Sequence, residues 1–258
     1  MGLAPLIGMM LCGVIMRNPV GFNMVFYTGS ALLLVGVILA FLLPRTEAKG
    51  KAESIDFKKI GVVAARKANI ASYAAIFSQW FMMGVITVLL PSYMVDLGMT
   101  AFHVAMVMVA TTAACVAFNY PAGLLSDKVG RKIPSIMGLA LLVIAINLIP
   151  VATSFEELIG LGILLGVGMG CILPPVLALI SDNTEKGERG TAMGIFHALI
   201  TLGVAVGAPV TGVLASEVGS SLAIHLSTLI PMAAIIAVLV LVKAGLPQRE
   251  VIVGGENE

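Results

Sequence analysis

Charged side chains are scarce in this sequence, and their scarcity excludes most classes of soluble protein. Asp, Glu, Lys and Arg make up 11% of the 258 residues, whereas hydrophobic residues make up 59%, and the mean hydropathy is +1.06. In a typical soluble domain about a quarter of the residues are charged. The composition is therefore typical of a chain that lies in lipid. The net charge of +1 carries no information by itself. We expect no nucleic-acid partner.

Groups that carry enzyme chemistry are also few. The three cysteines, Cys12, Cys115 and Cys171, lie inside apolar runs without the spacing of metal ligands, so we expect buried and inert thiols. The sequence shows no pairing of a nucleophile with a base and no cluster of metal-binding side chains. We therefore expect no enzyme, no metal site and no cofactor.

Long apolar runs, by contrast, fill most of the chain. A helix needs about 20 residues to cross the hydrocarbon core of a bilayer, and every run except the first meets that length. The first run also lacks the basic start of a signal peptide. We therefore predict an all-α polytopic membrane protein with about eight spans. The runs cover residues 1–16, 20–43, 69–95, 102–125, 132–152, 156–181, 190–215 and 219–243.

Basic residues indicate how these spans are oriented. If successive runs alternate in direction, only Arg17 falls on one side of the membrane and all other Lys and Arg fall on the opposite side. Cytoplasmic loops are enriched in Lys and Arg, so we predict a multi-pass protein of the cytoplasmic (plasma) membrane with its C-terminus in the cytoplasm. The residues on the cytoplasmic side are Arg45, Lys49, Lys51, Lys58, Lys59, Arg66, Lys67, Lys128, Arg131, Lys132, Lys186, Arg189, Lys243 and Arg249.

One long polar connection, residues 45–68, separates two runs from the six that follow. It holds a charged stretch at its start, and we predict a short helix on the membrane surface over Ile55–Val63. A weak internal repeat explains the uneven division, because Ala4–Gly8 and Ala208–Gly212 share Ala, Pro and Gly at the same spacing. Two parallel six-helix halves form a known transporter architecture, and the first run would then begin in the middle of a helix. We predict an N-terminally truncated chain with the last two spans of a first half in 1–44, a cytoplasmic linker in 45–68, a complete six-helix half in 69–245 and a cytoplasmic tail in 246–258.

The connection after the fourth run carries the most specific motif. Residues 123–132 read GLLSDKVGRK, which resembles the G-x-x-x-D-x-x-G-R-K signature of the major facilitator superfamily. In that family the signature recurs between the second and third helices of each half, and here it lies between the second and third spans after the linker. Ser181–Asp182 and Glu188–Gly194 resemble the junction between the family's fourth and fifth helices. The resemblance implies a helical bundle of the major facilitator type.

The resemblance also implies that this loop is a conformational gate. Gly130 permits a tight turn that would strain most side chains, and Gly123 permits two helix ends to approach closely. In the family the acid of the motif engages the neighbouring half and the loop arginine, and so latches one conformation of an alternating-access cycle; a helix N-terminus nearby would favour such an anion. The predicted gate comprises Gly123, Asp127, Gly130, Arg131, Lys132, Asp182 and Arg189.

Glycines in the sixth run suggest close helix packing. Gly162, Gly166 and Gly170 form G-x-x-x-G-x-x-x-G, a pattern that lets membrane helices approach closely. The GVGMG within this run begins like a dinucleotide-binding fingerprint. That fingerprint requires a preceding strand, and here it lies inside a predicted span, so we interpret these glycines as a packing stripe.

Candidate substrate contacts are few, because no Asp, Glu, Lys or Arg lies deep within the spans. Gln79 and Trp80 lie near the middle of the membrane, about eleven residues into their span, where polar groups often face a cavity. His197 lies roughly two turns inside its span; it is a candidate to contact solute or relay a proton, and packing between helices is the alternative. The absence of an intramembrane carboxylate favours a neutral or amphipathic organic solute.

These features predict a secondary transporter that moves a small organic solute by alternating access. The expected partners are that solute, the lipid bilayer, and protons or another ion as candidate coupling partners. Two alternatives stay open: a non-transporting fragment or membrane scaffold, and a sensor that uses the same fold without solute flux.

Overall fold

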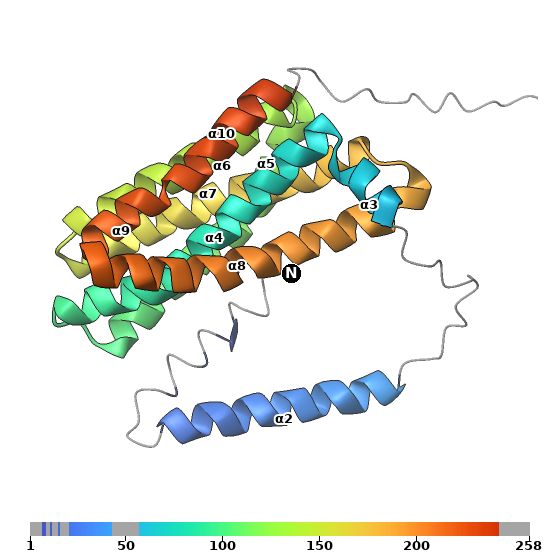
Figure 1. Ribbon diagram of the computed structural model, residues 1–258. Coiled ribbons are helices and arrows are strands. Elements are labelled where there is room, and N and C mark those ends of the chain that lie inside the picture. The colour runs from blue at the N-terminus through green and yellow to red at the C-terminus, as the bar shows by residue number, and fades with distance from the viewer. Residues whose placement is uncertain (1–6, 9–10, 12–14, 16–20, 43–56, 243–258) are drawn as a thin grey trace, which may run out of the picture.

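The computed structural model describes residues 7–8, 11, 15, 21–42 and 57–242, and these residues form helices and no strand (Figure 1). The first predicted span, residues 1–16, lies outside the described residues except at four single positions. The first half of the predicted linker, residues 45–56, and the whole predicted tail, residues 246–258, also lie outside them.

Within the described residues, seven helical stretches are long and apolar enough to cross a membrane, which confirms the seven full-length predicted spans. The predicted span over residues 156–181 is one unbroken helix that continues through Pro174 and Pro175. The last predicted span is broken into two helices at Thr228. The elements are α2 (Gly21–Leu42), α3 (Phe57–Ala64), α4 (Lys67–Asp96), α5 (Ala101–Val129), α6 (Lys132–Leu148), η1 (Ile149–Val151), α7 (Phe155–Asp182), η2 (Lys186–Glu188), α8 (Arg189–Val218), α9 (Ser220–Ser227) and α10 (Leu229–Leu241).

Helices α4 to α10 pack into one bundle (Figure 1). The contact between α4 and α8 corresponds to the contact between α7 and α5. In the same way, the contact between α6 and α7 corresponds to the contact between α10 and α4. Exchanging the unit α4–α6 with the unit α7–α10 therefore leaves these pairings unchanged. Two three-helix units related in this way are found within each half of transporters of the predicted type.

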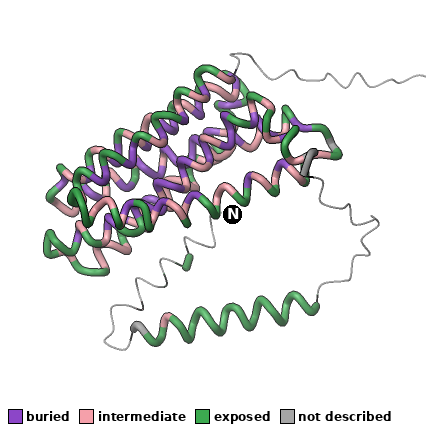
Figure 2. Tube along the Cα trace, in the orientation of Figure 1, coloured by how far each residue is buried: buried purple, intermediate pink, exposed green. Residues whose placement is uncertain are grey.

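The centre of the bundle lies along α4 and α7. In the apolar stretch of each span, 67% of the residues of α4 and 56% of those of α7 are buried. The corresponding fractions are 11% in α5 and 17% in α8. Figure 2 shows the same distribution, with buried positions gathered inside the bundle. α5 and α8 therefore lie at the flanks and present broad exposed surfaces.

α2 is exposed along its length and is drawn apart from the bundle (Figures 1 and 2). From Asn23 to Leu42 only Val25 is partly covered, although the helix is long and apolar enough to cross a membrane. An apolar helix of this length without protein cover fits a lipid environment.

α3 lies at the start of the bundle, where a short helix was predicted over residues 55–63. It packs on α8 and α4, and Val63 is fully buried. The Asn69 side chain at the start of α4 donates from Nδ2 to the carbonyl oxygen of Val63 over 2.8 Å. α3 therefore contacts protein through Val63, and its predicted position on the membrane surface stays a prediction.

Glycines set the closest approaches between helices. A β-carbon added at Gly166 would overlap the Thr111 carbonyl of α5, and one added at Gly170 would lie 2.7 Å from the Cys115 carbonyl oxygen. A β-carbon essentially never approaches another heavy atom within 3.0 Å, so these two helices meet at a distance that only glycine allows. At Gly162 the added atom would lie 2.9 Å from Thr111 Oγ1.

Close glycine contacts also occur outside the predicted stripe, at Gly168 and Gly203 among others. Gly168 packs toward α6, where an added β-carbon would lie 2.9 Å from the Gly138 carbonyl oxygen. Gly203 of α8 packs on α4, where the added atom would lie 2.9 Å from the Phe77 carbonyl oxygen. The glycines of the GVGMG run thus contact two helices, because Gly166 and Gly170 pack on α5 and Gly168 packs on α6.

Candidate functional site

The predicted gate is built on a two-residue connection between α5 and α6. α5 ends at Val129 and α6 begins at Lys132. Gly130 has φ +91° and ψ 161°, a backbone conformation that residues other than glycine adopt only with strain. Its N–H donates to the Ser126 carbonyl and closes the end of α5. This turn places Arg131 directly against the last turn of α5.

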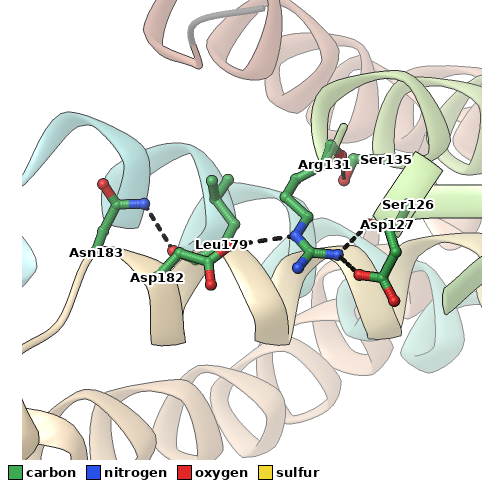
Figure 3. A network of polar contacts seen from close by, with 7 residues as sticks. All are labelled: Ser126, Asp127, Arg131, Ser135, Leu179, Asp182 and Asn183. Carbon is green, nitrogen blue, oxygen red and sulfur yellow. Dashed lines mark hydrogen bonds and ion pairs between the residues drawn. The ribbon is translucent and has the colours of Figure 1, made fainter. Parts of the chain in front are cut away.

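Arg131 joins the ends of three helices (Figure 3). Its Nη1 forms an ion pair with Asp127 and donates to Ser126 Oγ over 3.1 Å. Its Nε donates to Asp182 Oδ2 at the end of α7 over 3.2 Å. Charge-assisted hydrogen bonds of a planar guanidinium to carboxylates are among the stronger polar contacts in proteins. The structure therefore brings together Asp127, Arg131 and Asp182, three residues of the predicted gate.

The charges of this network are unevenly covered. The Arg131 side chain is 15% exposed, whereas Asp127 is 61% and Asp182 44% exposed. Burial of the guanidinium opposes its charge, but its hydrogen bonds to Asp127 and Asp182 outweigh burial and raise the pKa of Arg131 above its ordinary value. Asp127 lies in the last turn of α5, where the helix dipole disfavours an anion, so Arg131 rather than a helix N-terminus supplies its positive partner.

The remaining predicted gate residues take other positions. Lys132 donates from Nζ to the Leu239 carbonyl oxygen over 2.7 Å and so ties α6 to the last turn of α10. Gly123 makes no forced approach, because an added β-carbon would lie 3.7 Å from Pro174 Cβ, an ordinary van der Waals contact. Arg189 is exposed at the start of α8 and is not part of the Arg131 network.

A second arginine, which the sequence did not single out, contacts the same end of α7. Arg66, just before α4, pairs through Nη2 with Glu188 Oε2 over 2.8 Å. Its Nη1 donates to the Asn183 carbonyl oxygen over 2.7 Å. Arg66 and Asn183 are 117 residues apart in the chain, and no motif or spacing links them.

The candidate substrate residues on α4 and α8 differ in exposure. Gln79 is 3% exposed, and its Oε1 is buried without a hydrogen-bond partner, as is Nε1 of Trp80. Gln79 shares its helix face with buried Met82 and Ile86, so it points into the bundle. His197 is exposed on α8 rather than buried between helices.

Asn119 is a further polar residue that the sequence gave no reason to select. Its Oδ1 is buried without a partner, and the neighbouring Tyr120 is 74% exposed. Both lie about ten residues before the end of α5 at Val129, roughly 15 Å along the helix. Buried polar atoms are normally paired, so these unpaired atoms mark places where water or a ligand would be stabilised.

Within the described part of the chain, no three His, Cys, Asp or Glu side chains gather in a way that would hold a metal ion. Cys115 and Cys171 are free thiols, and Cys12 lies outside the described residues.

Comparisons with known proteins agree with this arrangement. The family model described as Major Facilitator Superfamily matches residues 72–257. The quinolone resistance protein NorA of Staphylococcus aureus (strain Mu50 / ATCC 700699) is 26% identical over 170 residues, which cover 66% of this chain and 44% of NorA. The uncharacterised MFS-type transporter C18.02 of Schizosaccharomyces pombe is 33% identical over 144 residues, which cover 54% of this chain and 32% of that protein. The chain thus spans less than half the length of these relatives.

Among solved structures, the POT family transporter PepTSo resembles this chain with a TM-score of 0.53. The superposition covers 72% of this chain and 37% of PepTSo, at 17% sequence identity. At this identity the likeness is one of fold alone.

Proposed function

Because this chain belongs to the Major Facilitator Superfamily, we propose that it moves a small organic solute across the cytoplasmic membrane by alternating access. The solute binds near the middle of the membrane between two six-helix halves, which rock about it. The observation that carries this proposal is the network in which Arg131 joins Asp127 and Asp182 from two different helices.

The strength of this network suits a contact that is made and broken in each transport cycle. Asp127 and Asp182 are both substantially exposed, and exposed ion pairs contribute only about 0.2–1 kcal/mol each. A bias of this size shifts the populations of two conformations without locking either one. We assign the making and breaking of contacts to Asp127, Arg131 and Asp182, and the rigid turn to Gly130.

The exposed flanks of the bundle support a division into two halves. In this proposal residues 69–245 are the second half, residues 45–68 are the linker, and α2 is the last span of the first half. The exposed face of α5 carries Tyr120, which is 74% exposed, beside Asn119, whose amide oxygen is buried without a partner. We therefore assign the exposed face of α5 to the contact with the first half and to the solute pathway.

The orientation follows from the same basic residues. Arg66 and Arg131 contact the same end of α7, so the linker and the gate lie on one side of the membrane. Loops rich in Lys and Arg stay in the cytoplasm. We assign that side, with the C-terminus, to the cytoplasm.

The proposed solute is a neutral or amphipathic organic molecule. The relative NorA is, by its name, a quinolone resistance protein, and quinolones are amphipathic aromatic compounds. Gln79, Trp80 and Asn119 have buried polar atoms without partners, which is the kind of group that a solute or its water shell would satisfy. We propose these three residues as candidates for the pathway, with His197 as a candidate on the exposed face of α8.

Counterflow in proteoliposomes tests the proposal. Liposomes that contain the protein are loaded with an unlabelled quinolone and diluted into the labelled compound. We expect transient accumulation of label above that in protein-free liposomes, and a change in rate with an imposed proton gradient would identify proton coupling.

The matched control is a preparation with the same amount of inserted protein and no internal quinolone. Accumulation that is equal in protein-containing and protein-free liposomes, for quinolones and for a panel of other amphipathic solutes, would contradict transport. That result would favour the alternative of a scaffold or sensor with the same fold.

A further inference from the structure

The connection between α7 and α8 is held by two arginines that come from different parts of the chain. Arg131 reaches Asp182 from the α5–α6 turn. Arg66 reaches the next residue, Asn183, at its carbonyl oxygen, and also pairs with Glu188. Two consecutive residues at the end of α7 are therefore fixed from two sides.

Arg66 is itself held in place by its neighbours. It is the N-cap residue of α4, but its side chain makes no cap to that helix and extends to the α7–α8 connection instead. Val63 is fully buried, and the Asn69 side chain donates to its carbonyl oxygen. The Ala65 N–H donates to the Gly61 carbonyl oxygen over 3.0 Å. The turn from α3 into α4, which contains Arg66, is thus held by these hydrogen bonds and by the burial of Val63.

The Arg66 contact is better covered than the contact made by Asp127. The side chains of Arg66 and Glu188 are 30% and 15% exposed, whereas Asp127 is 61% exposed. Coverage reduces the screening of a charge pair by water and salt. Glu188 is also the N-cap residue of α8, where the helix dipole favours an anion. Arg66 therefore fixes both the end of α7 and the start of α8.

We infer that Arg66 is a positioning residue of the cytoplasmic gate. By holding Asn183 and Glu188, it keeps the end of α7 in place, and Asp182 stays within reach of Arg131. This inference rests on the proposed function in one respect, the assignment of residues 45–68 as the linker between halves. Under that assignment, a movement of the linker is transmitted to the gate through Arg66.

Thiol labelling in nanodiscs tests this role without any substrate. The three cysteines are replaced by serine, and Ser135→Cys is introduced as the reporter. Ser135 is 2% exposed, and its Oγ donates to the Arg131 carbonyl oxygen, so its labelling by a hydrophilic maleimide measures opening at the gate. We expect Arg66→Ala to raise the labelling rate about fivefold, the change that corresponds to losing one partly exposed ion pair.

Controls separate positioning from general loosening. Lys67→Ala removes the neighbouring exposed charge and should leave the rate unchanged. A second reporter, Ser227→Cys, is 3% exposed in α9, away from the Arg66 contacts, and its labelling should not respond to Arg66→Ala. An equal increase at both reporters would show that Arg66 stabilises the whole bundle, and the inference would be wrong.

A double-mutant cycle identifies the partner. Glu188→Gln should also raise labelling of the Ser135→Cys reporter, but by less than Arg66→Ala because the Arg66 contact with Asn183 remains, and the double variant should do no more than Arg66→Ala. Exchanging the charges with Arg66→Glu and Glu188→Arg should restore the ion pair and slow the labelling in part, because a carboxylate at position 66 cannot donate to the Asn183 carbonyl oxygen. If Arg66→Ala fails to insert, Arg66→Lys, which keeps the charge but loses the two-pronged contact, should give an intermediate rate.

Additive effects in the cycle, or an unchanged rate in Arg66→Ala or Arg66→Lys, would overturn the inference. Because labelling needs no solute, a failure here is distinct from a failure of counterflow, which would overturn the proposed transport.

Discussion

Arg131 Nε donates to Asp182 Oδ2 over 3.2 Å and so ties the start of α6 to the end of α7 across 51 residues of sequence. The same guanidinium pairs with Asp127 through Nη1. A lysine ammonium keeps the charge but lacks the planar fork that serves both carboxylates. We predict that Arg131→Lys slows counterflow nearly as much as Arg131→Ala, by about twofold to tenfold. Initial rates at matched protein content measure this, and a rate for Arg131→Lys equal to that of the parent would show that charge alone suffices.

Asp127 is the more exposed of the two carboxylates that pair with Arg131. Asp127→Asn keeps the size of the side chain but removes its ion pair with Arg131. We predict near-normal insertion and abundance with slower counterflow, because a mostly exposed pair contributes little to folding and can still bias two conformations. Transport and membrane abundance are measured on the same preparations. Equal transport rates in parent and variant would contradict a gating role for this carboxylate.

Gly130 and Gly123 offer a matched pair in the same motif. Gly130 has φ +91°, where a non-glycine residue costs about 1–3 kcal/mol. At Gly123 an added β-carbon meets only an ordinary contact. We predict that Gly130→Ala lowers the thermal unfolding temperature in detergent and that Gly123→Ala leaves it nearly unchanged. A variant pair with equal unfolding temperatures would mean that the turn can relax around alanine.

The sequence predicted most of the architecture because hydropathy and helix length report directly on burial in lipid. It was less able to predict where helices end. The run expected over 102–125 is a helix from Ala101 to Val129, since a helix continues past the hydrocarbon core into its charged end, whereas hydropathy stops where lipid stops. The break at Thr228 precedes Pro231, which has no N–H to donate to the carbonyl oxygen of Ser227, the last residue of α9. The hydroxyl of Thr228 donates to the His225 carbonyl oxygen over 2.7 Å.

The gate could be anticipated only where a motif carries it. Asp127 and Arg131 are four residues apart, and the family pattern associates them with Asp182. Arg66 has no such pattern, because its contact with Asn183 depends on how α3, α4 and α8 pack. Its charge at the start of a span looks the same in sequence as that of Lys67, which has a different environment. Pairings of this kind become visible only when the helices are placed in space.

Gly166 and Gly160 test the packing of α7 on α5. A β-carbon at Gly166 would overlap the Thr111 carbonyl, whereas Gly160 of the same helix has nothing within 4 Å. Forcing extra volume into a packed interface costs about 1–3 kcal/mol. We predict that Gly166→Ala lowers the unfolding temperature and that Gly160→Ala does not, with unchanged topology by protease mapping. If both substitutions behave alike, the glycine stripe does not set the distance between α5 and α7.

Substitutions of Gln79 test whether its side-chain amide serves transport. Its Oε1 is buried without a partner, and an unpaired buried polar group costs about 1–3 kcal/mol. Gln79→Leu removes that cost within a face already lined by Met82 and Ile86, so we predict a higher unfolding temperature. If Gln79 contacts the solute pathway, the same variant should lose counterflow, because a polar group retained in a membrane helix at the expense of stability commonly serves transport. Gln79→Asn, which keeps the amide, should retain more activity than Gln79→Leu. A variant that is stabilised and transports at the parental rate would remove Gln79 from the pathway and leave water as the partner that its amide binds.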